Sequence, residues 1–388
     1  MRLFTLTTLL CGALSGTAHA APDSHATEVR LAKSLLDIRN NRLDIAMNEV
    51  DSLLRVNPNY KLAQLVRGDL LMAKAGAISS FGSASHASGD KIQDLQDEAR
   101  VRLQRAQAQP QTQHAPRYLW KLNEQQKYAL VVDTSRSTLY VYENVNGEPR
   151  YVADFYVTIG KLGTEKISSG DQRTPIGVYF VRANLPKKQL SDIYGSGAFP
   201  LSYPNEWDKK NGRTGSGIWL HGTPSNTYSR PPRASNGCVV LNNDDLNKLA
   251  PYLQVGITPV IITNKIAWAS KADQADRAAL LHEIELWRRD WASLNTDAYL
   301  KHYAHNFTSE NTNLEAWARQ KQGVNAGKSW IKVNLAELSL FTYPDQPNMV
   351  VVDFDQDYSS SNLSNHMKKR QYWIKKDNRW QILYEGSA

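Results

Sequence analysis

Ser235-Asn236-Gly237-Cys238-Val239-Val240-Leu241 says most about the fold and chemistry of this chain, because a turn of small residues passes there into an apolar run. Another apolar run, Gly217 to Leu220, ends at His221 and is followed by Gly222. This run predicts a strand that holds the backbone of His221, while Gly222 lets the chain turn away. A cysteine on a glycine turn near a histidine has what a nucleophile needs: a base and backbone N–H groups for an oxyanion.

The chain begins with the features of a cleaved export signal. Arg2 supplies a positive end, and Leu3 to Leu14 form an apolar stretch. Ala18-His19-Ala20 is a small-residue cleavage site, so residues 1–20 are predicted to be a signal peptide. We therefore expect an exported, periplasmic protein. No later apolar run approaches the roughly 20 residues of a membrane span, so no transmembrane segment is expected.

Export also bears on the two cysteines of the chain. Cys11 lies within the predicted signal, which leaves Cys238 without an intramolecular disulfide partner. The bulky Leu10 disfavours a lipoprotein signal at Cys11. A free thiol in an oxidising compartment is a liability unless it has a task, and this favours a chemical role for Cys238.

The length and the net charge of the chain limit the number of domains and the class of binding partner. At 388 residues the chain is long enough for two or three domains. Its formal net charge of +8 is spread along the sequence, which suits an acidic partner such as cell wall or another anionic surface. No cluster of Lys and Arg stands out, so nucleic acid is not expected as a partner.

Residues 21–115 are predicted to form a helical N-terminal region and a linker. Apolar residues recur at helical spacing from 25 to about 75, and Asn57-Pro58-Asn59-Tyr60 interrupts them. This order resembles a tetratricopeptide-like unit, but no second copy follows. A charged helix is expected from Asp90 to Ala106, between polar segments. The helices either bind a protein partner or pack on the neighbouring domain, and both remain open.

Two further domains are predicted. Residues 127–264 change to β-branched and aromatic runs parted by turn residues, which indicates a mostly-β domain. Residues 272–388 begin with a helix from Asp276 to Leu294 and another near Asp297 to His305, followed by strand-like runs. This order resembles the SnoaL-like, or nuclear-transport-factor-like, α+β cone, whose curved sheet wraps its helices. The predicted strands of the middle domain are 128–133, 138–142, 152–159, 178–181, 217–220 and 258–262.

The residues around Cys238 suggest how its thiol is activated. A thiol with the ordinary pKa of about 8.5 is only a few per cent ionised at neutral pH, so it needs a base, and His221 is the natural candidate. A backbone carbonyl would orient the imidazole. Gly237 permits a tight turn whose N–H groups, at Gly237 and Cys238, are expected to face an oxyanion. Ser235 is expected to brace this turn through its hydroxyl.

These residues carry a family resemblance. His221-Gly222 followed by Ser235-Asn236-Gly237-Cys238 resembles the HG…[S/T]xGC signature of the YkuD-type L,D-transpeptidases. Asp171 to Tyr179, which includes "TPIGVY", and Tyr156 to Gly160, "YVTIG", are similar to two further segments of that family. The resemblance covers residues 127–264. It implies a β-rich transpeptidase fold that acts on peptidoglycan stem peptides.

The resemblance also implies a mechanism and roles. In that family a cysteine attacks the L,D-amide bond between meso-diaminopimelate and D-Ala, and an amine or water resolves the acyl-enzyme. Here Cys238 would be the nucleophile and His221 the base. Gly222 would offer the orienting carbonyl, and Gly237 with Cys238 would line the oxyanion site. Tyr203 and Trp219 resemble pocket-lining positions.

Two positions depart from the pattern of many members. Asn236 stands where a second histidine is common, so His221 would act as the sole nearby base. Val240 stands where Arg or Asn is common, which removes a polar group near the substrate. Arg230 and Arg233 are proposed instead as carboxylate anchors, since a guanidinium pairs bidentately with a carboxylate. The predicted substrate-binding residues are Ser235, Asn236, Arg230, Arg233, Tyr203 and Trp219.

The domain order resembles the L,D-carboxypeptidases that trim tetrapeptides in curved or helical Gram-negative bacteria. Transpeptidation, carboxypeptidation, attachment or release of wall-bound lipoprotein, and a non-catalytic wall-binding or scaffolding role all remain open at this stage. No cofactor or metal is expected, and His282, His302 and His305 are read as solvated or capping residues. Asp353, Asp355 and Asp357 alternate along a predicted strand and are interpreted as a solvated face.

Overall fold

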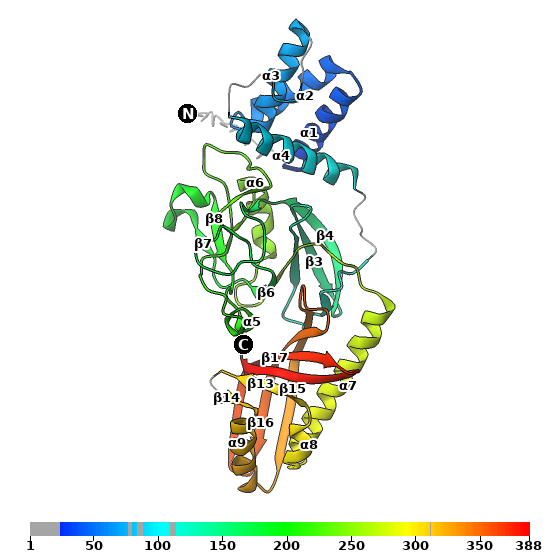
Figure 1. The fold of residues 1–388 in the computed structure, drawn as a ribbon, viewed down its shortest axis with the longest axis vertical. Helices are drawn as coiled ribbons and strands as arrows, with labels where there is room; N and C mark the ends of the chain where they lie inside the picture. The colour runs from blue at the N-terminus through cyan, green and yellow to red at the C-terminus, as the bar shows by residue number, and fades with distance from the viewer. Residues whose placement is uncertain (1–23, 77–79, 84–87, 109–113, 311) are drawn as a thin grey trace, which may run out of the picture.

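The computed structural model describes residues 24–76, 80–83, 88–108, 114–310 and 312–388. The predicted signal peptide and Cys11 lie outside these residues. Three bodies follow one another along the long axis of the molecule: a helical body, a β-rich body and an α+β body (Figure 1). This order confirms the multidomain fold predicted from the sequence.

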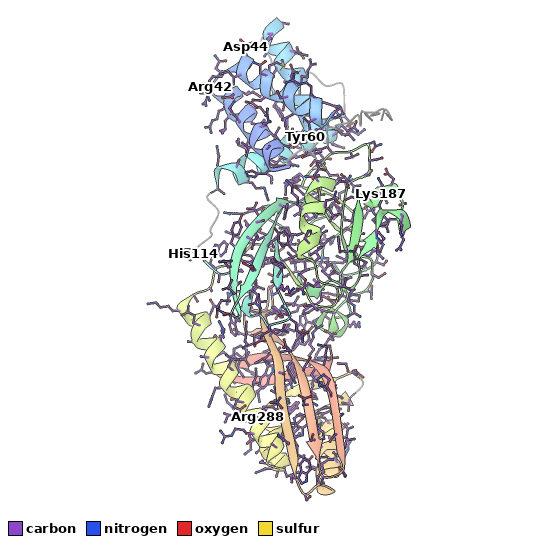
Figure 2. The ribbon with its side chains drawn as sticks, turned by 180° about the vertical axis from the view of Figure 1, so that it is seen from behind. Arg42, Asp44, Tyr60, His114, Lys187 and Arg288 are labelled. Carbon is purple, nitrogen blue, oxygen red and sulfur yellow. The ribbon has the colours of Figure 1, made fainter. Side chains whose placement is uncertain are left out.

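The helical body comes first in the chain. Its helices are α1 (Ser24–Arg39), α2 (Leu43–Val56), α3 (Lys61–Ala75) and α4 (Gly89–Gln107). Leu31, Val50 and Val66 form its buried core, and Ala99 of α4 joins them. The strongly charged α4 lies between the other helices and the β-rich body (Figure 1). Tyr60, at the start of α3, lies at the same junction (Figure 2).

The β-rich body contains two larger sheets and a short strand pair. One sheet has the order β4-β3-β2-β12-β6, and the other the order β11-β9-β8-β7. The first comprises β2 (Tyr128–Asp133), β3 (Thr138–Val145), β4 (Glu148–Tyr156), β6 (Gly177–Phe180) and β12 (Pro259–Thr263). The second comprises β7 (Leu185–Pro186), β8 (Gly197–Pro200), β9 (Trp219–His221) and β11 (Val239–Val240). The pair is β5 (Ile159–Gly160) with β10 (Arg233–Ser235), and the short helices are α5 (Glu206–Lys210) and α6 (Asn243–Leu249).

One predicted strand of this body is divided. The run 152–159 was expected to be continuous, but β4 ends at Tyr156 and Ile159 belongs to β5. Between them, the N–H of Thr158 donates to the carbonyl of Val240 at 2.8 Å, so the chain has left the first sheet at this point. β-Branched residues favour an extended backbone but do not specify which sheet they join.

The α+β body combines helices with one long sheet of order β1-β15-β16-β17-β18-β13-β14. Its strands are β1 (Leu119–Lys121), β13 (Tyr303–Ser309), β14 (Thr312–Asn313), β15 (Ile331–Thr342), β16 (Met349–Ser360), β17 (Leu363–Lys376) and β18 (Arg379–Ser387). Its helices are α7 (Lys271–Ala292), α8 (Thr296–Leu300) and α9 (Leu314–Ala326). Trp287 and Trp373, both buried, lie in its core. The membership of β1, far upstream in sequence, ties this sheet to the start of the β-rich body.

The helix predicted from Asp297 to His305 is wrong in its second half. The helix α8 ends at Leu300, His302 lies in a turn, and His305 lies on β13. The backbone is drawn into the sheet by pairing with β18, where the N–H of Ile382 donates to the carbonyl of His302 at 2.7 Å. The helix α9 was not predicted.

Of the residues of this body that were expected to be solvated, His282, His305 and Asp357 are exposed, whereas others are shielded by partners. His302 is buried and bridges Glu283 at 2.7 Å and Asp290 at 2.8 Å, so its expected solvated or capping role is wrong. The predicted solvated face of β16 is a cross-strand ladder. It pairs Asp353 with Arg370, Asp355 with Lys368, and Asp357 with His366.

The described residues contain neither a cluster of metal-ligand side chains nor a membrane-spanning helix. Within residues 24–388, leaving out the gaps given above, no group of three or more His, Cys, Asp or Glu side chains is arranged to hold a metal ion. No helix in that same part of the chain is long and apolar enough to cross a membrane.

Candidate active site

The turn before Cys238 is shaped by its neighbours. Gly237 has φ +121°, and a Cβ there would lie 2.7 Å from the carbonyl oxygen of Arg173, so the position needs glycine. Ser235 Oγ donates to the carbonyl of Cys238 at 2.6 Å and accepts from the N–H of Gly237 at 3.1 Å. Thr174 Oγ1, from the "TPIGVY" segment, donates to the carbonyl of Gly237 at 2.9 Å. The thiol is therefore carried on a turn braced from both sides.

His221 lies on the strand next to this turn. The strands β9 and β11 run parallel, with Val239 opposite Leu220 and Val240 opposite His221. Because alternate residues of a strand share a face, this register directs Cys238 and His221 to the same side of the sheet. The structure thus places the two residues that sequence analysis paired on the same face of neighbouring strands.

The imidazole of His221 is buried and oriented. Its Nδ1 lies 2.7 Å from the carbonyl oxygen of Gly222, which only accepts, so the proton sits on Nδ1 and Nε2 keeps its lone pair. Burial lowers the pKa of His221 to about 4, and the positive charge of Arg230 acts in the same direction. The ring is therefore neutral at neutral pH and able to accept a proton. Tyr194 packs edge-on against it, with 5.2 Å between ring centroids.

The thiol of Cys238 is protonated in this arrangement. Burial raises its pKa, while the N–H of Trp219 and the charges of Arg230 and Lys166 oppose that rise. Sγ donates to the carbonyl of Gly217 at 3.3 Å. Among the described residues, no hydrogen bond joins Sγ to the ring of His221.

Two cations near the thiol are held differently. Lys166 is buried, and its Nζ lies 2.7 Å from a carboxylate oxygen of Asp171. Burial by itself would raise the pKa of Asp171, but the bonds from Lys166 and from backbone N–H groups outweigh it and lower that pKa to about 2. Arg230 is held through its carbonyl, which accepts from Tyr156 at 3.0 Å and Thr158 at 3.1 Å. Its guanidinium has no hydrogen-bond or ion-pair partner in the part of the chain that the structure describes.

The expected oxyanion donors differ in availability. The N–H of Gly237 already donates to Ser235 Oγ. The N–H of Cys238 has no acceptor among the described residues, so it remains open to a ligand. In the resting structure one of the two predicted donors is therefore free.

The other predicted binding residues differ in their exposure and in their contacts with the site. Trp219 is partly exposed and packs on Tyr194, with 4.7 Å between ring centroids. Tyr203 is buried, its hydroxyl donates to the carbonyl of Thr214 at 2.9 Å, and it faces the site only through Lys166, whose Nζ lies 5.9 Å from its ring. Asn236 is exposed.

Among the predicted site residues, Arg233 has the fewest contacts with the site. It is exposed on β10, and no described contact joins it to the thiol or to His221. Sequence reasoning missed Lys166, Tyr194 and Gly217. Asp171 was part of the recognised segment, but nothing local indicated that Lys166 pairs with it or that Tyr194 covers His221.

Comparisons with known proteins match two parts of the chain to protein families. Residues 127–262 match the YkuD L,D-transpeptidase catalytic domain, and residues 279–386 match the Cds6 C-terminal NTF2-like domain. Neither match includes the helical body. No curated protein matches the chain.

Two solved structures resemble most of the chain. Bd1075 from Bdellovibrio bacteriovorus has a TM-score of 0.62 and 28% identity, over 71% of this chain and 98% of that one. The helical cell shape determining protein Pgp2 from Campylobacter jejuni has a TM-score of 0.61 and 27% identity, over 70% of this chain and 95% of that one.

Proposed function

Because this chain contains a YkuD-type L,D-transpeptidase catalytic domain followed by a Cds6-type NTF2-like domain, we propose that it is a periplasmic cysteine enzyme of peptidoglycan. It cleaves the L,D bond between meso-diaminopimelate and D-Ala in tetrapeptide stems. The observation that carries the proposal is the neutral His221, oriented by the carbonyl of Gly222, on the strand beside the braced Cys238 turn.

The first half-reaction starts from the protonated thiol. Sγ leaves the carbonyl of Gly217, and Nε2 of His221 takes its proton. Arg230, Lys166 and the N–H of Trp219 favour the thiolate. The thiolate attacks the diaminopimelate carbonyl carbon, and the free N–H of Cys238 donates to the oxygen that becomes negative.

The tetrahedral intermediate then collapses. The C–N bond breaks, His221 returns its proton to the departing amine, and D-Ala leaves while a thioester to Cys238 remains. His221 next deprotonates water or an amine, which attacks the thioester carbonyl carbon. The C–S bond then breaks, and His221 returns the proton to sulfur, which regenerates the thiol. Water yields a tripeptide and an amine yields a cross-link, so the acceptor decides between carboxypeptidation and transpeptidation.

One of the two structural neighbours, Pgp2, favours a role in cell shape. Pgp2 is described as a helical cell shape determining protein, and it is similar to this chain over 95% of its own length. We therefore propose that trimming of stems to tripeptides is the principal reaction. Chromatography of muropeptides after digestion separates the outcomes: tripeptides mean hydrolysis, 3–3 dimers mean cross-linking, and released or attached lipoprotein would appear in the same profile.

Covalent labelling tests the nucleophile. A carbapenem, which acylates cysteines of this family, should add its mass to the wild-type protein and not to Cys238→Ala. Ser225→Ala, an exposed change in a loop of the same domain, serves as the control and should be labelled like the wild type. An unlabelled wild-type protein would contradict the proposed mechanism.

A second candidate is a non-catalytic wall-binding or scaffolding protein. The observation in its favour is the hydrogen bond of the Cys238 thiol to Gly217 rather than to His221. A Cys238→Ala strain whose wall composition equals that of the wild type would support this reading.

A further inference from the structure

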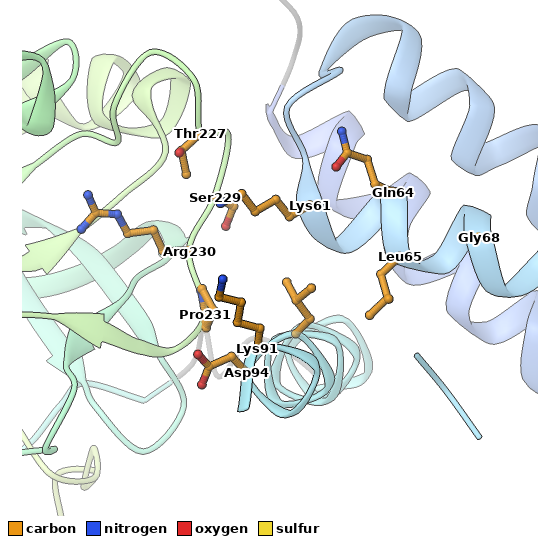
Figure 3. A pocket seen from close by; sticks show the side chains of 11 residues that line it. Lys61, Gln64, Leu65, Gly68, Lys91, Asp94, Thr227, Ser229, Arg230 and Pro231 are labelled. Atoms are coloured by element: carbon orange, nitrogen blue, oxygen red, sulfur yellow. The ribbon is translucent and has the colours of Figure 1, made fainter. Parts of the chain in front are cut away.

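A cavity of about 690 Å³ separates the helical body from a loop of the catalytic domain. One wall comes from α3 and α4 and includes Lys61, Lys91 and Asp94. The other wall is the segment Ser229–Arg230–Pro231 (Figure 3). This segment leads into β10 and from there to the Cys238 turn, so one wall of the cavity and the thiol belong to one continuous stretch of chain.

The cavity carries an excess of positive charge. Lys61 and Lys91 extend across it toward the loop (Figure 3). Neither ammonium group has an ion-pair partner among the described residues. Asp94 is the lone carboxylate of the lining. Two unpaired ammonium groups facing one carboxylate favour an anionic ligand.

The loop wall is fixed to the helical body by buried polar contacts. The guanidinium of Arg102, on α4, donates to Ser229 Oγ and to Glu98, and it stacks on Tyr156 with 3.8 Å to the ring centroid. Ser229 Oγ donates in turn to Glu98 Oε1 at 2.9 Å. Separating buried charged partners is costly, so the two walls form one preformed groove.

A second contact holds Tyr228, the residue directly before Ser229. The ring of Tyr228 packs on that of Tyr60, with 4.7 Å between centroids. The backbone N–H of Tyr228 also points to the carbonyl of Asn59 at 3.5 Å. The start of the loop is therefore anchored both to α4 and to the residues that precede α3.

Arg230 connects this groove to the thiol. Its backbone and side-chain stem line the cavity, while its guanidinium points into the catalytic domain (Figure 3). There its charge acts on Cys238. Arg230 is thus the one lining residue of the groove whose charge is shown to act on the thiol.

We propose that this groove binds the carboxylate-bearing part of a peptidoglycan stem peptide whose scissile bond lies at Cys238. This inference rests on the proposed function and adds a role for the helical body. The ligand class is an acidic peptide, because lysine ammonium groups pair with carboxylates. The helices then form one side of the substrate site.

The test uses the full chain with Cys238→Ser, so that a bound peptide is not turned over. Binding of a disaccharide tetrapeptide is measured by calorimetry in Lys61→Glu/Lys91→Glu, in Arg39→Glu and in the unmodified background. The groove variant should raise Kd by about tenfold, the loss expected for two ion pairs near a surface. Arg39→Glu, an exposed change on α1 outside the groove, should leave Kd unchanged.

A second ligand separates groove contacts from overall charge. A tetrapeptide with amidated carboxyl groups should bind the background protein more weakly and should be nearly insensitive to Lys61→Glu/Lys91→Glu. A Kd equal to that of the Arg39→Glu control, or an equal loss for both peptides, would overturn the proposal. Both lysines are exposed, and an unchanged thermal midpoint confirms that the variant folds.

Acylation of Cys238 separates this proposal from the proposed function. Acylation by a carbapenem needs no stem peptide, so Lys61→Glu/Lys91→Glu with Cys238 intact should be labelled at the wild-type rate. If the wild-type protein is not labelled, the proposed reaction fails, whereas the binding comparison still decides whether the groove takes an acidic peptide.

Discussion

The thiol of Cys238 donates to the carbonyl oxygen of Gly217 at 3.3 Å, so in this structure the nucleophile is in its resting, protonated form. The proton stays on sulfur because burial raises the pKa of the thiol. Its base, His221, is kept neutral on the adjacent strand. Activation therefore starts from a neutral thiol and a neutral imidazole, and a proton transfer between them leaves the net charge of the free enzyme unchanged.

The pH dependence of the reaction should report His221. Burial lowers the pKa of His221 to about 4, so the ring is a base at any pH above that value. We predict that kcat/KM for tripeptide release decreases at acid pH, with an apparent pKa near 4. Initial rates measured from about pH 3 to 9 check this.

The matched variant is His221→Gln. It should lower kcat/KM by about 10²-fold or more, the usual contribution of a general base, and its profile should lack the acid limb. An acid limb near the ordinary histidine pKa of about 6.5 in the wild type would contradict the buried, neutral imidazole.

Gly237→Ala should damage the turn that carries the nucleophile. The added Cβ meets the carbonyl oxygen of Arg173 at 2.7 Å, at a φ of +121°. We expect a loss of about 1–3 kcal/mol in the free energy of unfolding and a large drop in acylation rate. Gly163→Ala is the control, because Gly163 has φ +82° but open space around it. If both variants acylate alike, the close approach at Gly237 is unimportant.

Substitutions of Arg230 and Arg233 should affect the acylation rate of Cys238 differently, although the two arginines are close in sequence. Arg230→Gln removes a positive charge that favours the thiolate, so acylation by a carbapenem should slow by about tenfold. Arg233→Gln removes an exposed charge with no described contact to the thiol, and acylation should stay within about twofold. Stopped-flow measurement of the adduct gives both rates. Equal slowing by the two variants would show that only long-range charge matters.

Arg102→Met should destabilise the junction between the helical body and the catalytic domain. The change leaves Glu98 buried without its cation, which costs about 3–5 kcal/mol in the free energy of unfolding. Denaturant titration measures the loss. Arg67→Met breaks the exposed pair with Asp51 and should cost at most about 1 kcal/mol.

Adding Glu98→Gln to Arg102→Met provides the reciprocal check. The second change removes the uncompensated carboxylate, so it should recover part of the lost stability. Absence of any recovery would place the destabilisation in lost packing against Tyr156 rather than in charge.

Local sequence patterns account for the strands and the nucleophile turn that could be predicted. Alternating or continuous β-branched runs placed β2, β3 and β12, and the glycine turn placed Cys238 at the end of a polar segment. The prediction failed at His302 and His305, where apolar spacing fits a helix but β18 supplies hydrogen bonds to an extended chain. It also failed at Asp353, whose carboxylate pairs with Arg370 across the strands. Pairing between distant segments overrides local preference in both places.

The sequence by itself determined the domain order and the pairing of a glycine-borne cysteine with a histidine that ends a strand, because these depend on local backbone preferences and short motifs. Only the tertiary structure decided which charges surround the thiol. Lys166 reaches the site by pairing with Asp171, and the helical body reaches it through Arg102 and Ser229, which are 127 positions apart. Such contacts depend on how whole domains pack, and burial then sets the pKa of each group.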